Sequence, residues 1–448
     1  MDRTPDGTEP PAAGPPSRAP QRPVTVDAEG SAAVSGARLR LRTGGFAAGG
    51  GCVARGPDGR VVFVRHSLPG EEVVAVVTDA SRRFLRADAV AVLEASPHRV
   101  TPRCPHAGPG RCGGCDWQHV SLPAQRRAKA SLVAAQLRQV AGLDVDVVVE
   151  EVPGWADGYG WRTRMQFAVD PSGRAGLRRH RSHQVEPVDD CLLAAPGIGA
   201  AGLLGARWPP AGLIRVATTA AAGGEPTTRQ VVVEPRQAAR PGHRQPPARL
   251  PPHPPAGPPP LTVEVQGRRL QVSAGSFWQV HPGAPQVLAS AVTAGLAPQA
   301  GDRLVDLYAG VGLFAAVLGP LVAPGGSVTA VESAPCAVAD ARRNLADLGE
   351  ATVVAAEVSP ALVARQLGRP DLVVLDPPRR GAGTGISAAL AGCGARRIAY
   401  VACDPAAAAR DLRVLLGHGW RLRSLRAFDL FPMTEHVEVV AVVEPGPR

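Results

Sequence analysis

The sequence predicts an α/β protein with a doubly wound parallel sheet near its C-terminal end, a small antiparallel β-barrel near its N-terminal end and an α+β region between them. After residue 271, strand-like apolar runs alternate with helical patterns at intervals of roughly 25 to 40 residues, which is typical of a doubly wound sheet. Before residue 97, short apolar runs separated by Pro and Gly turns indicate the barrel.

Composition and charge narrow the class of protein. The chain has 448 residues, which corresponds to about two to four domains. Hydrophobic residues make up 45% and charged residues 20%, so a fully disordered chain is excluded. The net charge of +10 favours an anionic partner such as nucleic acid.

Nearly all of the positive charge comes from arginine. Lys129 is the only lysine and Asn344 the only asparagine, which indicates a coding bias against both residues. No apolar run reaches the length of about 18 residues that a membrane span needs, and residues 1–21 lack the apolar centre of a secretory signal. The eight cysteines are too unevenly spaced for a disulfide scaffold, so we expect a location in the reducing cytoplasm.

The N-terminal half divides into three parts. Residues 1–36 have no apolar periodicity and are interpreted as a disordered tail. Residues 37–97 form the predicted barrel, with strand candidates at 61–64, 73–77 and 89–93. Residues 98–270 form a central α+β domain with a helix expected over 123–140 and a polyproline-like surface insertion at 235–260.

Residues 271–448 carry the pattern of the doubly wound sheet. Buried strands are expected at 303–308, 327–332, 371–376 and 439–443, with another ending near Cys403. Helices are expected over 285–296, around Arg342 and Arg343, and after Pro405, which suits a first helical turn.

A glycine-rich turn follows the first of these strands. In the segment Asp306–Gly312 the glycines let the backbone approach a ligand, and Glu332 ends the next strand. An acidic residue about 20 residues after such a glycine-rich turn typically binds ribose hydroxyls. Because the third glycine of the dinucleotide pattern is missing, a ribose-bearing ligand without a pyrophosphate, such as S-adenosylmethionine, fits best. A glycine turn in an unrelated α/β fold is the alternative.

Polar residues follow three further strands of the predicted sheet. Asp376 comes after an apolar strand, and Cys403 precedes a helix whose positive end favours a thiolate. Glu438 stands at the mouth of a buried strand, where an unpaired carboxylate is costly. Glu435 is the competing carboxylate and is expected to be more exposed. A helix cap for Asp376 and a structural role for Cys403 are the alternatives.

A cysteine cluster marks the central domain. Cys112 and Cys115 form a CxxC motif with two small glycines, Cys104 is a third candidate ligand and Cys191 fits as the fourth. Four thiolates suit either zinc or an iron–sulfur cluster, and spacing leaves the two open. Unliganded thiols, or His106 or His119 as a ligand, are alternatives.

Several motifs together resemble the S-adenosylmethionine-dependent RNA uracil-5-methyltransferase family of the RumA/TrmA type. They are FWQV (277–280), DLYAGVGLF (306–314), VES (331–333), LDPPRRG (375–381), YVACDPAAAARDL (400–412) and FPMTEHVE (431–438). The resemblance implies a Rossmann-like methyltransferase domain, an N-terminal OB-like barrel of the TRAM type and a central cluster-bearing domain. It extends over nearly the whole chain from residue 37.

The resemblance also implies residue roles. Cys403 matches the nucleophile and Glu438 the general base, while the cofactor-contacting positions match Gln279, Tyr308, Glu332 and Asp376. Leu313 departs from the family's usual Asn, which puts one polar contact near the cofactor in doubt. The CGGC pattern with a distant fourth cysteine implies a 4Fe-4S cluster, although the Cys104–Cys112 gap is two residues longer than in the best-known members.

The implied reaction transfers a methyl group from S-adenosyl-L-methionine to C5 of a uridine through a covalent Cys–C6 adduct. In this family, the barrel and the cysteine cluster favour 23S rRNA over tRNA as the substrate. The enzyme is expected to be a monomer. Basic segments with interleaved aromatic residues, at 82–86, 161–167 and 174–183, are the candidate RNA surface. A non-catalytic RNA-binding or ribosome assembly factor is the main rival, and an iron–sulfur redox sensor is another.

Overall fold

The structure is a computed structural model that describes residues 35–198, 202–208, 211–219, 228–235, 258–365 and 367–447. The predicted disordered tail (1–36) and the Pro-rich insertion (235–260) therefore lie almost entirely outside the described residues. No helix among the residues described is both long and apolar enough to cross a membrane.

Five short strands form the N-terminal barrel. They are β1 (Arg38–Arg42), β2 (Cys52–Arg55), β3 (Val61–Arg65), β4 (Glu72–Ala80) and β5 (Phe84–Glu94), paired in the order β1-β4-β5-β3-β2. The three strand candidates lie within β3, β4 and β5. The β3–β5 pair is parallel and the other pairs are antiparallel. The N–H of Gly44 donates to the carbonyl of Val53, which links the end of β1 to β2 and closes the barrel.

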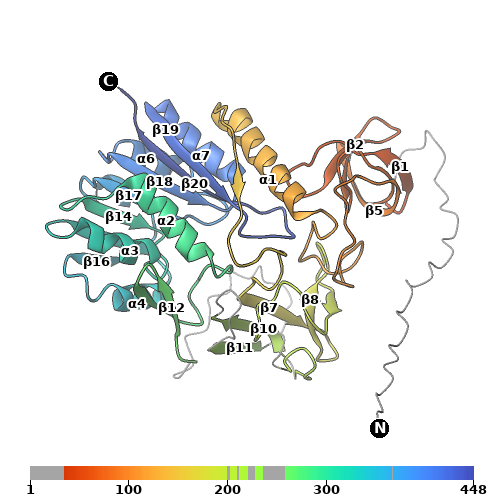
Figure 1. The fold of residues 1–448 in the computed structure, drawn as a ribbon, viewed down its shortest axis with the longest axis horizontal. Coiled ribbons are helices and arrows are strands. Elements are labelled where there is room, and N and C mark those ends of the chain that lie inside the picture. The colour runs from red at the N-terminus through yellow and green to blue at the C-terminus, as the bar shows by residue number, and fades with distance from the viewer. Residues whose placement is uncertain are drawn as a thin grey trace, which may run out of the picture.

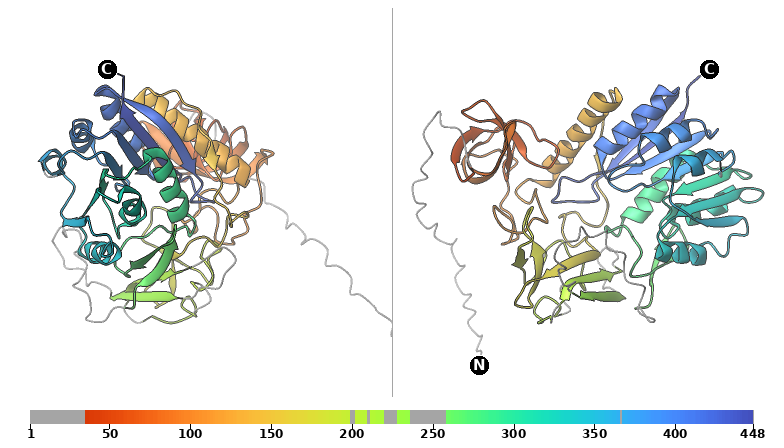
Figure 2. Two further views of the ribbon diagram at one scale, coloured as in Figure 1. Left: turned by 60° about the vertical axis from the view of Figure 1, so that its left-hand side comes forward. Right: turned by 180° about the vertical axis from the view of Figure 1, so that it is seen from behind.

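One long helix connects the barrel to the rest of the molecule. Helix α1 (Leu122–Gln136) continues as a π-helical turn (Leu137–Ala141) and ends at Gly142, whose φ of 68° is left-handed. Val133 and Leu137 pack into the core on one face of the C-terminal sheet. Figures 1 and 2 show α1 between the barrel at one end and this sheet at the other.

A second antiparallel sheet forms the centre of the chain. Its order is β11-β10-β7-β8-β9, from β7 (Arg164–Val169), β8 (Ala175–Arg178), β9 (Val185–Pro187), β10 (Ala211–Thr218) and β11 (Arg229–Pro235). The hairpin of β12 (Leu261–Val265) and β13 (Arg268–Val272) follows it. This part is therefore mainly β, with Phe167 and Ile198 fully buried in its own core.

The C-terminal sheet has eight strands in the order β16-β15-β14-β17-β18-β20-β19-β6. They are β14 (Arg303–Leu307), β15 (Ser327–Glu332), β16 (Ala351–Ala355), β17 (Leu372–Leu375), β18 (Arg397–Ala402), β19 (Trp420–Phe428), β20 (Glu438–Pro445) and β6 (Val149–Glu150). The first five strands in the sheet order are parallel, as predicted, whereas β20 runs antiparallel to β18. The edge strand β6 comes from the region that the sequence analysis assigned to the central domain.

Helices cover both faces of this sheet, which completes a three-layer α/β arrangement (Figure 2). Helices α2 (Ala284–Leu296) and α3 (Leu313–Val322) pack on one face, and α4 (Pro335–Asn344) lies beside β16. Helices α5 (Pro360–Arg365), α6 (Thr384–Ala391) and α7 (Pro405–Gly417) pack on the other face. The predicted doubly wound architecture is thus confirmed.

Strand direction brings the polar strand ends to one edge of the sheet. The carboxyl ends of β14, β15, β17 and β18 meet there, as in any parallel sheet. Because β20 is antiparallel to β18, it is the first residue of β20 that reaches the same edge. Ala402 pairs with Val439, so Cys403, just after β18, comes next to Glu438, the first residue of β20.

Candidate active site and cysteine site

A cavity of about 790 Å³ opens at this edge. All six residues that the sequence analysis assigned to catalysis or cofactor binding line it: Gln279, Tyr308, Glu332, Asp376, Cys403 and Glu438. They come from the segment before α2 and from the ends of β14, β15, β17, β18 and β20. A cavity lined by convergent polar groups at the strand ends of such a sheet is the expected place for a ligand.

Cys403 is held at the start of α7. The side chain of Asp404 caps the helix by accepting a hydrogen bond from the N–H of Ala407 at 2.9 Å, and Pro405 occupies the first turn. Cys403 is partly exposed to the cavity, and Glu438 beside it is 3% exposed. The two side chains therefore reach the cavity from neighbouring strands.

The electrostatics of Cys403 differ from the sequence expectation. The pKa of the thiol is raised to about 12, mainly by burial and then by the charge of Glu438, with a smaller contribution from Asp376, while Arg379 lowers it. The expectation that the α7 terminus favours a thiolate is therefore wrong for the free protein. Desolvation and two nearby acidic groups outweigh the effect of the helix dipole.

The acidic groups of the site share this environment. Burial raises the pKa of Asp376 to about 7, and burial together with the charge of Asp376 raises the pKa of Glu438 well above its usual range. The side-chain amide of Gln279 donates to Asp376 at 3.4 Å. Protonated carboxyl groups at neutral pH are typical of acid–base sites.

Two further cavity residues were quoted in the motifs but received no role. Arg379 of the DPPR motif contacts the Nε2 of His436 at 3.4 Å. Burial, followed by the charge of Arg379, lowers the pKa of His436 to about 4, so this imidazole is neutral at physiological pH. Arg379 thus places a positive charge beside Cys403 and Glu438, whose pKa values it lowers.

The glycine-rich turn forms the opposite wall of the cavity. Gly310 has a left-handed φ of 57° and donates its N–H to Glu332 Oε2 at 2.9 Å. The amide of Asn344 donates to the carbonyl of Val311 at 2.9 Å and so anchors the turn from α4. Leu313, the departure from the family pattern, is 6% exposed and presents an apolar side chain to the cavity.

Glu435, the competing carboxylate, does not line the cavity. Its side chain lies against the barrel, where a Cβ added to Gly50 would come within van der Waals overlap of its Oε2. Burial and the charge of Asp116 raise the pKa of Glu435 to about 7. The geometry therefore favours Glu438 as the carboxylate that reaches a ligand.

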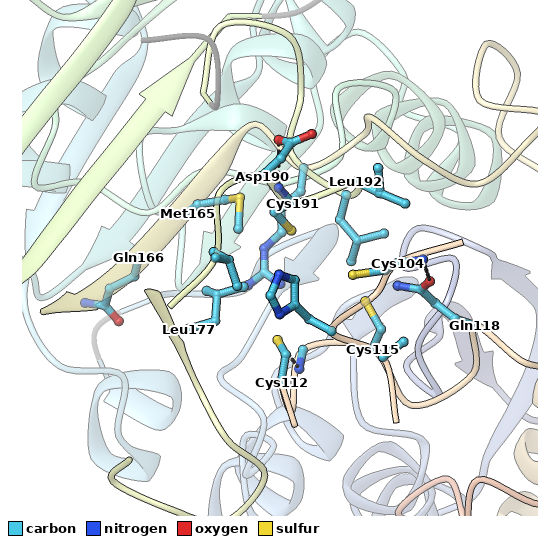
Figure 3. Close-up of a pocket in the computed structure, with 16 residues that line it drawn as sticks. Cys104, Cys112, Cys115, Gln118, Met165, Gln166, Leu177, Asp190, Cys191 and Leu192 are labelled. Atoms are coloured by element: carbon cyan, nitrogen blue, oxygen red, sulfur yellow. Dashed lines mark hydrogen bonds between the residues drawn. The ribbon is translucent and has the colours of Figure 1, made fainter. Parts of the chain in front are cut away.

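The four candidate ligand cysteines line a second, smaller cavity of about 180 Å³. Figure 3 shows Cys104, Cys112 and Cys115 on one side, from the loop before α1, and Cys191 on the other. The pKa of Cys112 is raised to about 11, mainly by burial, with smaller contributions from the thiols of Cys191 and Cys104. Four thiols around one cavity provide the donor set that a cationic metal or cluster would bind.

The cysteines surround this space without converging on one point. In the part of the chain that the structure describes, no group of three or more His, Cys, Asp or Glu side chains could hold a metal ion. His106 also lines the cavity, but its Nδ1 lies 3.4 Å from Glu186. His119 does not line it, and its Nε2 lies 3.3 Å from the carbonyl of Ser67.

The two cavities share a wall that the sequence analysis missed. Gly114 of the CGGC motif and Arg162 line both, and Gly113 and Asp116 line the larger one. The cysteine loop therefore forms part of the candidate active site. Only the fold reveals this, because Gln279, the first of the six site residues in the chain, comes 167 residues after Cys112 (279 − 112 = 167).

The candidate RNA segments differ in exposure. Arg82 and Arg83 are exposed, and Arg86 stacks over Phe84 at 5.0 Å. In the segment 161–167, however, Trp161, Met165 and Phe167 are buried, so the expected interleaved surface is wrong there. Met165 and Phe167 point inward from β7, whereas Arg162 lines both cavities.

Both the barrel and the chain as a whole are similar to known proteins. The TRAM domain model matches residues 36–90, which covers the barrel. An uncharacterized RNA methyltransferase of Streptomyces coelicolor is 46% identical over 96% of this chain and 98% of its own length. A 23S rRNA (uracil(1939)-C(5))-methyltransferase RlmD of Shewanella amazonensis is 32% identical over 86% of this chain and 91% of its own length.

The fold has a counterpart among solved structures. The Pyrococcus abyssi tRNA (uracil-54, C5)-methyltransferase, solved with S-adenosyl-L-homocysteine, matches with a TM-score of 0.66 and 20% identity, covering 90% of this chain and all of the other. The TRAM barrel, the Rossmann-like sheet and the relatives together define an RNA methyltransferase. The chain belongs to the RNA methyltransferase family whose members include the RlmD-type enzymes.

Proposed function

We propose that this enzyme transfers a methyl group from S-adenosyl-L-methionine to C5 of a uridine in 23S rRNA. The observation that supports it most is the placement of Cys403 and Glu438 side by side at one cavity with the glycine-rich turn and Glu332 opposite. A thiol and a carboxyl group within reach of one pyrimidine are what methylation at C5 requires.

The proposed chemistry follows from the residues in the cavity. C5 of uracil is a poor nucleophile, and addition of the Cys403 sulfur to C6 converts the ring into an enolate that is nucleophilic at C5. The bound donor supplies an electrophilic methyl group, which C5 takes while the donor leaves as a neutral thioether. Glu438 then removes the proton from C5, elimination breaks the C6–S bond and releases the Cys403 thiolate, and Glu438 returns its proton to the sulfur. The proton that the thiol gave up on addition to C6 goes to solvent, and it is the one proton that the whole transfer releases.

The pKa values of the free enzyme suit a site that reacts only when the RNA substrate and the methyl donor are both bound. Burial together with Glu438 and Asp376 keeps Cys403 protonated in the free protein. A cation bound beside these carboxylates favours their ionised forms, and Glu438 can then accept a proton. The thiol is thereby protected from side reactions until substrate and donor are both in place.

The donor site is proposed on the opposite wall. Glu332 ends β15 and faces the turn at Gly310, the position from which a carboxylate reaches ribose hydroxyls. Tyr308, Gln279 and Asp376 are proposed as further contacts to the donor. Because Leu313 is apolar, it would pack against the donor and make no hydrogen bond.

The cysteine site is proposed to hold a 4Fe-4S cluster. Four thiols around a cavity of about 180 Å³ supply the ligand set of such a cluster. The cluster would staple the loop that forms part of the active-site wall. Anaerobic purification followed by iron analysis and visible absorption tests this, and stoichiometric zinc without visible absorption would contradict it.

Incubation of purified enzyme with radiolabelled S-adenosylmethionine and either 23S rRNA or tRNA tests the function. We expect label in 23S rRNA as 5-methyluridine, and none with Cys403→Ala. Label in tRNA alone would identify the tRNA enzyme as the correct alternative. RNA binding with no label in either RNA would instead support a non-catalytic assembly factor.

A further inference from the structure

The only lysine of the chain occupies a buried position against the loop that leads to Glu438. The Lys129 side chain, on α1, is 0% exposed. Its Nζ donates to Oδ1 of Asp429 at 2.6 Å and to the carbonyl oxygen of Phe431 at 3.0 Å. A buried ammonium group is costly unless it is paired and hydrogen-bonded, and Lys129 is both.

Its partners belong to the segment 429–437, which joins β19 to β20 and which we call the base loop. Phe428 pairs with Glu438 in the β19–β20 register, so the base loop leaves and returns to the sheet beside the cavity. The N–H of Asp429 also donates to the carbonyl of Glu150 at 2.8 Å. The cavity-lining residues of this loop and its end are Phe431, Thr434, His436 and Glu438.

The same face of α1 holds the middle of the base loop. Gln125 lies one turn before Lys129, and its Oε1 accepts the N–H of Met433 at 2.9 Å. Met433 has a left-handed φ of 66°, a conformation that a non-glycine residue keeps only when its surroundings hold it. The N–H of Trp117 donates to the carbonyl of Met433 at 3.0 Å. The base loop is therefore clamped at several points.

Lys129 differs from the arginines of the other ion pairs because its side chain is completely buried. The other ion pairs in the described residues use Arg, apart from one formed by His106. The arginines of those pairs keep side-chain exposures between 14% for Arg65 and 67% for Arg42. A compact ammonium fits a closed site, whereas the broad, planar guanidinium needs more room. A coding bias that removed lysine elsewhere has left it at this one position.

We infer that Lys129 is a positioning residue for methyl transfer, which anchors the base loop so that Glu438 faces the pyrimidine held at Cys403. The inference rests on the proposed function, because it concerns the step in which Glu438 removes the C5 proton. It predicts that loss of Lys129 slows this step more than it weakens RNA binding.

The test compares Lys129→Arg and Lys129→Met with a matched control, Arg396→Met. Arg396 pairs with Asp302 and donates to the carbonyl of Leu296, at the start of β18 and thus at the sheet edge opposite Cys403. For both Lys129 variants we expect kcat to fall by about a hundredfold, the scale of a misplaced catalytic group, with KM for RNA changed by less than about threefold. Arg396→Met should retain kcat.

Trapping of the covalent RNA adduct separates positioning from folding. The Lys129 variants should accumulate a methylated adduct on denaturing gels, and Glu438→Gln should do the same, because elimination awaits removal of the C5 proton. The double variant K129M/D429L removes both buried charges and should recover thermal stability without recovering kcat. If Lys129→Arg turned over like Arg396→Met, or no adduct accumulated, the inference would be wrong; absence of methyl transfer by the unaltered enzyme would overturn the proposed function itself.

Discussion

Two neighbouring glycines in the cysteine motif should respond very differently to the same substitution. A Cβ added to Gly113 would lie 2.7 Å from Cα and 2.8 Å from N of His180, which are backbone atoms of the turn between β8 and β9. A Cβ added to Gly114 would meet only Cys112 Sγ, at an ordinary 3.5 Å. Gly113→Ala must therefore displace a backbone segment, whereas Gly114→Ala need displace nothing.

The displaced turn is tied to the cysteine loop, so the strain has no easy release. The N–H of Gly113 donates to the carbonyl of Arg178 at 3.1 Å, and Arg179 pairs with Glu186 across the same hairpin. We expect Gly113→Ala to lower the free energy of unfolding by about 1–3 kcal/mol, the usual cost of overpacking. Gly114→Ala should change it by less than about 0.5 kcal/mol.

Denaturant unfolding of both variants, followed by circular dichroism and by metal content, measures this difference. Gly113→Ala should also bind less iron, because the turn that it displaces holds the loop of Cys112. Equal stability of the two variants would refute the close packing of the CGGC motif against the β8–β9 turn.

Three further predictions concern the active site and the barrel. Because burial raises the pKa of Cys403 to about 12, its thiolate fraction at pH 7 is about a thousandfold below that of an ordinary cysteine. Its iodoacetamide alkylation, followed by peptide mass spectrometry, should be slow in the free protein and still rising at pH 10; a plateau near pH 8 would contradict the burial. Asn344→Ala removes the amide that holds the glycine-rich turn and should weaken S-adenosylmethionine binding by about tenfold in calorimetry; unchanged affinity would show that the turn holds its own shape. Burial raises the pKa of Glu71, but hydrogen bonds from Arg99 and backbone N–H groups outweigh it and lower the net pKa. Glu71 therefore stabilises the fold above its unfolded-state pKa and loses this contribution as the pH falls through its folded-state pKa, so Glu71→Gln should flatten the acid unfolding curve.

The wall shared by the two cavities connects the cysteine site to the candidate active site. Gly114 and Arg162 border both cavities, so a change in the cysteine loop moves part of the surface that a pyrimidine would contact. The charge of Arg162 lowers the pKa of both Cys191 and His436, one at each cavity. Loss of a bound cluster would thus alter the active site through this wall.

Elements with local sequence signals could be predicted before the structure was known. Strand periodicity, the turn at Gly310, the acidic residue at Glu332 and Pro405 in the first turn of α7 each depend on residues close together in the chain, and the structure has them where they were expected. Motif order was also enough to name the family. Such features need no knowledge of distant contacts, because backbone conformation and capping act over a few residues.

Which of these residues come into contact, and which of them are protonated, depends on long-range packing. The antiparallel direction of β20 places Glu438 next to Cys403, and the contact of Glu435 with the barrel takes it away from the cavity. Strand β6 joins a sheet whose other strands begin about 150 residues later (303 − 149 = 154). The thiol of Cys403 stays protonated for the same reason: desolvation and neighbouring charge depend on atoms from remote parts of the chain, which no local pattern encodes.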